Sequence, residues 1–300
     1  MVLLWALFAN AQVTTADVVG TVHDSTGAVI ADAKVAITNL GTGLTRTAQS
    51  GASGDFVINL LPPGTYSVRI EAPSFKTFNV STLNLASGDR TRIDAAMQAG
   101  QTTETIEVTT ATPLLQTDSS TLSSTITSQA VQDLPLNGRN FVQLAQQVPG
   151  ANGGPGNGLT SGNRPDDRRQ TSAISVNGQT EVINNQLIDG IDNNERIIGG
   201  LGVRPSVDAI AEFTVQTNDY TAEVGRTAGG VINVITKSGS NNFHGSAYEY
   251  FRNDKLDAHS YFDQTGSRKP ELRQNQYGGS IGGPIIKDKT FFFGDYEGFR

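Results

Sequence analysis

The sequence contains no cysteine, and this absence removes three kinds of chemistry at once. A chain without cysteine has no disulfide framework, no zinc site built on thiolates and no thiol nucleophile. Charge is also scarce, because only 17% of the 300 residues are charged, and the formal net charge is −7. An acidic chain of this kind lacks the basic face that nucleic-acid binding needs. The sequence also has no run of about 18 apolar residues, so it offers no membrane-spanning helix.

Residues suited to catalysis or metal binding are few and scattered. The three histidines, His23, His244 and His259, lie far apart in the chain. A Ser/His/Asp arrangement requires free choice among many serines and aspartates. The acidic cluster at residues 189–195 lacks the spacing of a calcium-binding loop. We therefore expect no catalytic residue, no metal site and no cofactor, and we interpret the chain as something other than an enzyme.

The N-terminus has the pattern of the second half of an export signal. Residues 2–8 are apolar, and Ala9, Asn10 and Ala11 form a small-x-small cleavage pattern. No lysine or arginine precedes the apolar stretch, which leaves either a start further upstream or a chance apolar terminus. We predict that residues 1–11 are a partial signal peptide.

Glycine, threonine, serine and asparagine are abundant, and this composition suits β-strands and turns better than a helical core. Short alternating segments recur at intervals of about ten residues and are separated by turns that contain Gly, Pro and Asp. These segments cover residues 18–22, 33–38, 56–61 and 66–70. The spacing predicts a β-sandwich over residues 12–98.

A stretch rich in Thr, Ser and Gln follows, and its composition predicts an extended linker over residues 99–127. One segment within it alternates and has high β-propensity, comprising Glu104, Thr105, Ile106, Glu107, Val108 and Thr109. The segment has no obvious partner strand, and an unpaired strand is a template on which another chain docks. The alternative is a final edge strand of the sandwich. The position of the segment before the next unit favours docking. The segment resembles the TonB box, which outer-membrane transporters present to the energy-transducing protein TonB.

The next unit combines short helices with short strands. Ser128 is the expected cap of a helix over residues 128–134, and a second helix is predicted over residues 140–147. Short strands separated by turns follow at residues 172–177, 184–188, 211–216 and 230–237. These elements predict an α+β unit over residues 128–240.

A long loop, residues 151–170, lies between these helices and strands and is dominated by Gly, Asn, Pro, Asp and Arg. A loop of this length is uncommon unless it is functional or disordered. Arg164, Arg168 and Arg169 suit contact with an anionic ligand, while a solvated loop is the more frequent explanation for such charges.

Residues 241–300 alternate as transmembrane β-strands do. Tyr248 and Tyr250 share one face of a first strand, as expected where a strand crosses a membrane interface. A second strand alternates over residues 276–283, and a charged turn is predicted at residues 284–289 before an aromatic strand. So few strands do not close a barrel, and an open edge in hydrocarbon leaves unsatisfied backbone groups. We therefore expect an incomplete barrel, in which these strands alone order poorly, and a chain that is part of a longer protein.

Several sequence blocks in one order resemble known families. The carboxypeptidase regulatory-like domain, a transthyretin-like sandwich related to carbohydrate-binding folds, is similar to GTVHDSTGAVIADAKVAITN and GDFVINLLPPGTYSVRIEAPSFK. The plug domain and barrel entry of TonB-dependent receptors of the Oar-like branch are similar to LPLNGRNFVQLAQQVPG, ISVNGQTEVINNQLIDGIDNN, VDAIAEFTVQTNDYTAEVGRTAGGVINVITKSGSN and HGSAYEYF. The sandwich family shares a scaffold more than an activity, so it implies no peptidase.

The resemblance implies a mainly β chain. It would contain an N-terminal transthyretin-like or carbohydrate-binding-like β-sandwich, an α+β plug domain and the first strands of an outer-membrane β-barrel. Such a receptor sits in outer-membrane lipid, with the sandwich and the TonB box in the periplasm. It imports a bulky nutrient, namely a siderophore, oligosaccharide or peptide, when TonB acts on the box and moves the plug. The alternative is a secreted or surface adhesin, or a carbohydrate-binding β-sandwich protein with a repetitive stalk.

Overall fold

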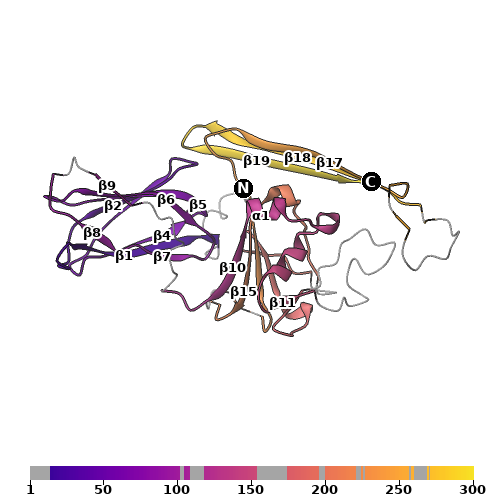
Figure 1. Ribbon diagram of the computed structural model, residues 1–300, viewed down its shortest axis with the longest axis horizontal. Coiled ribbons are helices and arrows are strands. Elements are labelled where there is room, and N and C mark those ends of the chain that lie inside the picture. The colour runs from indigo at the N-terminus through magenta and orange to yellow at the C-terminus, as the bar shows by residue number, and fades with distance from the viewer. Residues whose placement is uncertain are drawn as a thin grey trace, which may run out of the picture.

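Figure 1 shows the computed structural model as three β-rich units, coloured from indigo at the N-terminus to yellow at the C-terminus. The structure describes residues 14–101, 105–108, 118–153, 174–195, 200–220, 224–225, 227–256, 258–259, 269 and 271–300. The predicted partial signal peptide, residues 1–11, lies outside the described residues. Of the described residues, we call 14–101 with 105–108 the sandwich, 118–240 the plug unit and 244–300 the C-terminal sheet.

The sandwich consists of two facing β-sheets. Its strands are β1 (Ala16–Asp24), β2 (Lys34–Asn39), β3 (Thr45–Gln49), β4 (Asp55–Leu61), β5 (Gly64–Glu71), β6 (Thr77–Leu85), β7 (Arg90–Arg92), β8 (Ala95–Met97) and β9 (Thr105–Val108). One sheet has the order β4-β1-β7, with β8 also paired to β1, and the other has the order β3-β2-β5-β6-β9. This topology confirms the β-sandwich predicted from the alternating segments.

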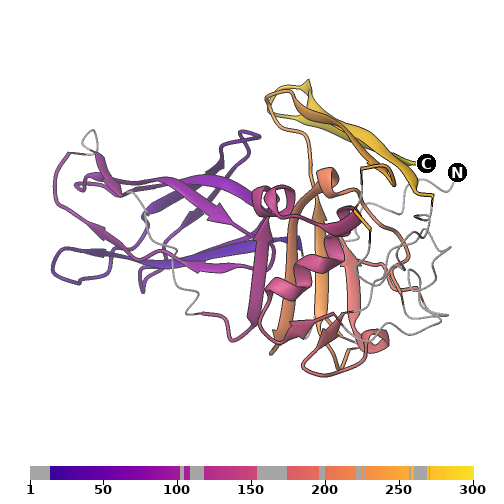
Figure 2. The same cartoon turned by 45° about the vertical axis from the view of Figure 1, so that its right-hand side comes forward.

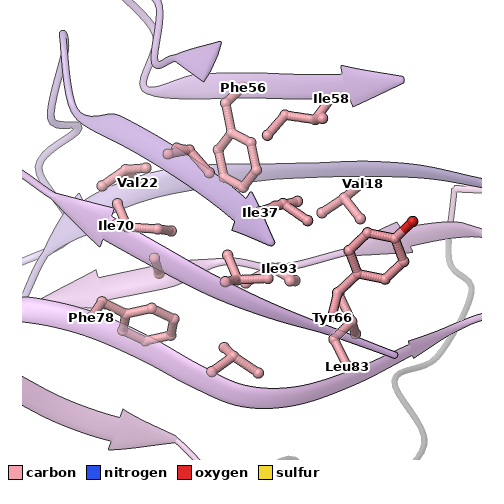
Figure 3. Close-up of a cluster of buried hydrophobic side chains, with 14 of the residues drawn as sticks. Val18, Val22, Ile37, Phe56, Ile58, Tyr66, Ile70, Phe78, Leu83 and Ile93 are labelled. Carbon is pink, nitrogen blue, oxygen red and sulfur yellow. The ribbon is translucent and has the colours of Figure 1, made fainter. Parts of the chain in front are cut away.

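Strand alternation fills the space between the two sheets with apolar side chains, because successive residues of a strand point to opposite faces. Tyr66, Ile37 and Ile70 are fully buried there. Figure 3 shows them with side chains from β1, β4 and β6 directed into the same core. The Tyr66 hydroxyl donates to the Pro62 carbonyl oxygen over 2.5 Å, so the polar end of this large side chain is satisfied.

The plug unit contains a five-stranded sheet with helical turns on one face. Its elements are β10 (Leu122–Thr127), α1 (Ser128–Asp133), η3 (Asn137–Arg139), η4 (Phe141–Gln147), β11 (Ala151–Asn152), β12 (Ser175–Val176), η5 (Glu181–Ile183), β13 (Asn185–Ile188), β14 (Ile191–Asp192), η6 (Val207–Ala209), β15 (Ile210–Asn218) and β16 (Val231–Thr236). The sheet order is β10-β15-β16-β13-β14, and β11 and β12 form a separate pair. Figure 2 shows α1 and η4 lying on one face of the sheet.

An apolar core fills the space between η4 and the plug sheet. The rings of Phe141 and Phe213 meet edge to face, with their centroids 6.0 Å apart. Leu144 and Val234 belong to the same buried cluster, so helix and sheet share one core. Within the described part of the chain, no helix is long and apolar enough to span a membrane.

Two expectations about the start of the plug unit were wrong. Residues 122–127 were assigned to the linker, but they form β10, which pairs with β15 along its length. Their Ser- and Thr-rich sequence hides the strand, because only Ile126 is buried while the Thr125 and Thr214 hydroxyls bond across the pair over 3.0 Å. Ser128 is not the helix cap, because Thr127 precedes α1 and its side chain makes no capping bond. Pairing of β10 with β15 holds the chain at the start of this helix in place of a side-chain cap.

The C-terminal sheet is a three-stranded antiparallel meander of β17 (His244–Asn253), β18 (Arg273–Ile286) and β19 (Thr290–Phe299). The β17 and β18 register is regular from His244 opposite Gly282 to Asn253 opposite Arg273. The charged turn predicted at residues 284–289 is shorter, because β18 continues through Pro284 to Ile286. The register with β19 shifts between these two residues, and such an irregularity accommodates a proline that has no N–H for the ladder.

The two faces of the C-terminal sheet differ. On one face, Phe251, Ile281 and Tyr296 are 56%, 57% and 64% exposed. An exposed apolar face of this kind is typical of a lipid-facing strand surface. Tyr248 and Tyr250, which were expected at a membrane interface, lie on the opposite face, where both rings contact Arg139 of the plug unit.

We predict that Gly20→Ala destabilises the sandwich by about 3 kcal/mol, at the upper end of the usual cost of overpacking. A Cβ at Gly20 on β1 would overlap the Ile93 carbonyl oxygen and lie 2.9 Å from the Phe56 ring. The control is Gly51→Ala, where the nearest atom, the Asp55 carbonyl oxygen, is 3.7 Å away. Urea unfolding followed by circular dichroism measures both effects, and equal midpoints for the two variants would contradict the prediction.

Candidate functional site

The plug unit presents one arginine to the C-terminal sheet. Arg139 ends the η3 turn, where Gly138 and Arg139 both adopt left-handed backbone conformations with φ of 63° and 55°. Glycine adopts this conformation without a steric penalty, which is why Asn137–Gly138 favours a tight reversal at this point. Asn140 then caps η4, because its side-chain oxygen accepts from the Val142 N–H over 3.1 Å. The turn and the cap together place Arg139 at the edge of the plug unit.

Arg139 is largely buried against charged and aromatic partners. Its guanidinium forms an ion pair with Asp208 of η6, and the two side chains are only 14% and 11% exposed. Its central carbon lies 4.3 Å from the ring centroid of Tyr248 and 4.6 Å from that of Tyr250, both on β17. A cation between aromatic faces in a poorly hydrated site is held by the rings as well as by the carboxylate. These contacts join the plug unit to the first strand of the C-terminal sheet.

Hydroxyl groups extend this contact to the neighbouring strands. The Ser246 hydroxyl on β17 donates to Asp208 over 2.9 Å, and the Tyr248 hydroxyl donates to Glu297 on β19 over 2.7 Å. Glu297 also lies 3.7 Å from the Arg139 Nε. We call these residues the Arg139 cluster, comprising Arg139, Asp208, Ser246, Tyr248, Tyr250 and Glu297. The cluster is a polar bridge between the plug unit and the sheet.

A cavity of about 500 Å³ adjoins the Arg139 cluster. It is lined by α1 and the turn after it on the plug side and by β17 and β18 on the other, including Leu134, Tyr250, Phe251 and Gln276. Because the cavity lies between the two units, any movement of the plug unit against the sheet changes its shape.

Lys237, just after β16, lies close to the same contact. Burial lowers the pKa of its ammonium group, and the negative charges of Asp208 and Asp295 partly oppose that shift. Among the described residues, no group of three or more His, Cys, Asp or Glu side chains is placed to hold a metal ion. The contacts seen here are charge pairing and hydrogen bonding between the plug unit and the C-terminal sheet.

The sandwich contacts the other face of the plug sheet through Glu212 on β15. The Ser87 N–H, in the turn after β6, donates to the two carboxylate oxygens over 3.1 and 3.3 Å. The Asn233 amide on β16 donates to the Ser87 hydroxyl over 3.5 Å. Burial raises the pKa of Glu212 to about 7, Asp89 adds to the rise, and the Ser87 N–H opposes it. This carboxyl therefore titrates near neutral pH.

A second contact of the sandwich is with the segment that joins the plug unit to the C-terminal sheet. The Asn241 N–H donates to the Gly41 carbonyl oxygen, in the turn between β2 and β3, over 2.9 Å. The Asn241 side chain and Asp288 exchange two hydrogen bonds of 2.7 and 2.9 Å. Since Asp288 lies in the turn between β18 and β19, Asn241 connects the sandwich to the end of the C-terminal sheet.

The sequence suggested that the TonB-box-like segment has no partner strand, but in the structure it has one. Thr105–Val108 forms β9, which pairs in parallel with β6 from Thr77 opposite Thr105 to Val80 opposite Val108. The edge-strand alternative is therefore correct for its structure, because the free edge of β6 is available to it in the folded sandwich. Glu104 and Thr109 lie outside the described residues.

The other sequence-predicted site falls outside the described residues, namely Arg164, Arg168 and Arg169. Sequence reasoning missed Arg139, Asp208 and Glu212 as functional candidates. The Asn-Gly-Arg-Asn turn was recognised as a turn, but its arginine stood in no charge cluster. Asp208 lies 69 positions away from Arg139 in the chain, so no local pattern joins the pair.

Two family models match parts of the chain. The carboxypeptidase regulatory-like domain matches residues 17–98, and the outer membrane beta barrel domain matches residues 235–300. The first match covers most of the sandwich strands, and the second covers all of the C-terminal sheet.

Curated relatives match over a longer span. The TonB-dependent transporter Oar of Myxococcus xanthus is 29% identical over 317 residues, which cover 98% of this chain and 27% of Oar. The probable TonB-dependent siderophore receptor PirA of Acinetobacter baumannii is 28% identical over 184 residues, which cover 58% of this chain and 22% of PirA. The crystal structure of PirA aligns at 25% identity with a TM-score of 0.42, covering 58% of this chain and 24% of that structure. The chain thus spans about a quarter of the length of these relatives.

We predict that Arg139→Ala destabilises the plug contact by about 3–5 kcal/mol, because it leaves the buried Asp208 carboxylate without its cation. Asp208→Asn in the same chain recovers part of that loss, since the uncompensated charge is then absent. Arg139→Lys keeps the charge but loses the planar guanidinium between the rings, so its stability falls between those of the unaltered chain and Arg139→Ala. Urea unfolding of the unaltered chain, Arg139→Ala, Asp208→Asn and the double variant forms a double-mutant cycle, which measures the coupling between the two side chains. Strictly additive effects of the two substitutions would contradict it.

We predict that the contact between sandwich and plug unit weakens as pH rises through about 7. The pKa of Glu212 is raised from its ordinary value of 4.5 to about 7, mainly by burial, and we expect it to return towards the ordinary value when the sandwich separates and water reaches the carboxyl. Between pH 4.5 and about pH 7, the docked carboxyl therefore holds a proton that the separated carboxyl has lost. Docking is thus strongest below pH 4.5, and this stabilisation is lost as the pH rises through about 7. The total effect is at most on the order of 3 kcal/mol.

Hydrogen exchange of the Ser87 amide across this pH range, corrected for the intrinsic rate, measures the docking. The control is Glu212→Gln, which keeps the shape of the side chain and does not titrate. We expect its protection to be independent of pH, and the same pH dependence in both proteins would assign the effect to another group.

Proposed function

This chain belongs to the TonB-dependent outer-membrane receptors that carry an N-terminal carboxypeptidase regulatory-like domain, and from that premise we propose that it gates and couples nutrient import. It is a protein of the outer membrane, and its curated relatives are transporters. In the proposed mechanism, the plug unit obstructs a barrel that begins with the C-terminal sheet. TonB then acts on residues 104–109 from the periplasm and moves the plug unit, which admits a bulky nutrient.

The observation that carries this proposal is the polar nature of the contact between the plug unit and the C-terminal sheet. Among the described residues, the plug core cluster includes no side chain of that sheet. The two units meet instead through the charged and hydroxyl groups of the Arg139 cluster. Polar groups that separate exchange one set of hydrogen bonds for another, whereas a shared apolar core would have to enter water. This supports a plug unit that moves against the wall while its own core stays folded.

The order of elements along the chain supports coupling to TonB. The segment that resembles the TonB box, residues 104–109, precedes β10 in the sequence, with residues 110–121 between them. β10 is an edge strand of the plug sheet and pairs only with β15 among the described strands. Edge elements with few partners open at a lower free energy than the whole unit. A pull on the box therefore reaches an element of the plug unit that is suited to local rearrangement.

The nutrient is proposed by class only. PirA is named as a siderophore receptor, which favours an iron chelate among siderophore, oligosaccharide and peptide. Arg164, Arg168 and Arg169 suit the anionic groups of such a chelate. We propose no catalytic role for any residue. The barrel match over residues 235–300 favours transport over a secreted or surface adhesin, whose C-terminal part would consist of further sandwich repeats.

We predict that Ile106→Pro/Glu107→Pro abolishes nutrient uptake by a complete receptor that contains this chain. Successive residues of a strand direct their N–H groups to opposite edges, so the two prolines remove a donor from each edge. The control is Ile106→Thr/Glu107→Thr, which keeps both N–H groups and a high β-propensity. Growth of a receptor-deleted strain on a ferric siderophore, an oligosaccharide or a peptide measures uptake. Growth with the proline variant that equals growth with the threonine control would reject the coupling role.

A further inference from the structure

Two turns at one end of the sandwich contact different parts of the molecule. β2 and β6 both pair antiparallel with β5, so they finish at the same end of their sheet. Figures 1 and 2 both show this end directed towards the plug unit. The turn after β6 contacts the plug sheet at Glu212, and the turn after β2 contacts the segment that joins the plug unit to the C-terminal sheet. The sandwich therefore spans the joint between two units that the proposed mechanism moves against each other.

The turn after β2 has a fixed shape that suits this contact. The Asn39 side-chain oxygen accepts from two N–H groups of the turn, both over 2.9 Å. Asn39 is only 7% exposed, so water competes little for these bonds. The turn directs the Gly41 carbonyl oxygen to the Asn241 N–H. Gly43 approaches Asp288 so closely that a Cβ on the glycine would lie 2.5 Å from the Asp288 Oδ1.

The C-terminal sheet holds the joining segment from the other side. Gly239 packs against the carbonyl oxygens of Gly283 and Phe292, where a side chain has no room. Two hydrogen bonds of 2.7 and 2.9 Å tie Asn241 to Asp288. The segment thus lies between the sandwich and the end of the sheet. We call the four residues that meet at this point the latch contact, comprising Gly41, Gly43, Asn241 and Asp288.

The two contacts of the sandwich differ in burial. At the plug sheet, Ser87, Glu212 and Asn233 are only 5%, 7% and 3% exposed. The latch contact consists of three exposed residues and one half-buried residue. Hydrogen bonds that water reaches open at a lower free energy than buried ones. When the plug unit moves, the sandwich is therefore expected to stay on the plug sheet and to leave the joining segment.

We propose that the sandwich is a latch for the plug unit, and that the turn after β2 must leave Asn241 before the plug unit moves. This inference rests on the proposed function, in which the plug unit moves against a barrel wall. While the latch contact holds, the plug sheet, the sandwich and the end of the C-terminal sheet form a closed ring of contacts. Movement of the plug unit then has to break a contact of this ring in addition to the Arg139 cluster.

The first test needs neither TonB nor a nutrient. Val131 is fully buried and lines the cavity between the plug unit and the C-terminal sheet, so the thiol of Val131→Cys reacts with a maleimide when the two units separate. The labelling rate is measured on a purified complete receptor that contains this chain, with either Gly43→Ala or Gly27→Ala added. Both glycines have a left-handed φ, 74° and 89°, so both substitutions strain a turn of the sandwich. A Cβ at Gly27 has no atom of the described residues within 4 Å, which makes it the matched control.

We expect Gly43→Ala to raise the labelling rate about fivefold, as the net loss of about one hydrogen bond would. The reason is that the added Cβ displaces the Asp288 carboxylate from Asn241. Gly27→Ala leaves the rate unchanged. Equal labelling rates for the two variants would overturn the proposal.

The second test closes the latch contact covalently in the complete receptor. A Cβ at Gly41 would lie 3.8 Å from the Ser240 Cβ, within the spacing of about 3.5–4.5 Å that disulfides have, and this chain contains no native cysteine. Gly41→Cys/Ser240→Cys is compared with Thr38→Cys/Thr45→Cys, which joins β2 to β3 within the sandwich. Uptake of whichever ferric siderophore, oligosaccharide or peptide the unaltered receptor imports is measured before and after reduction. We expect a loss of uptake in the oxidised form of the first pair only, and its recovery on reduction.

Equal uptake by the oxidised and reduced forms of Gly41→Cys/Ser240→Cys would count against the latch and overturn it. If this disulfide does not form, the labelling rates decide the matter. Absence of any uptake by the unaltered receptor would instead reject the proposed function. The labelling rates would then still decide whether the sandwich holds the plug unit in place.

Discussion

The guanidinium of Arg139 lies between the plug unit and the C-terminal sheet, where its side chain is only 14% exposed. A charge removed from water at such a position is costly unless its partners compensate closely. Asp208 supplies the opposite charge, and the rings of Tyr248 and Tyr250 supply two aromatic faces. These partners come from both units, so they meet in only one relative placement of plug and sheet. The position of the cavity beside the cluster follows from that placement.

The three units differ in how they hold together internally and how they hold to one another. The sandwich and the plug unit each have a separate apolar core, and within the described residues neither core draws side chains from the C-terminal sheet. Between units the contacts are hydrogen bonds and charges, at Ser87 with Glu212, at Gly41 with Asn241 and at the Arg139 cluster. Apolar burial thus stabilises the sandwich and the plug unit, while titratable and polar groups set how the units are arranged. The proposed movement of the plug unit would exchange polar partners and leave each core intact.

Local pattern predicted the strands of the sandwich well, because alternation with glycine and proline turns is a property of neighbouring residues. The same reasoning was less successful where a strand owes its existence to a distant partner. β10 has too few apolar residues to stand out from a linker, and it forms because β15 offers a pairing edge. Pro284 was assigned to a turn, although a register shift lets β18 continue past it. In the candidate site, Arg139 was visible only as part of a turn.

The sequence by itself determined the β-rich class, the scarcity of catalytic and metal-binding chemistry, and the segments that alternate. These depend on composition and on residues within one strand length of each other. Only the tertiary structure decided that β9 pairs with β6, that both tyrosines of β17 face the plug unit, and that Asp208 meets Arg139 from 69 positions away. Each of these is a contact between residues distant in the chain. Its free energy depends on which edges and faces remain open after the units have folded, and no local pattern encodes that.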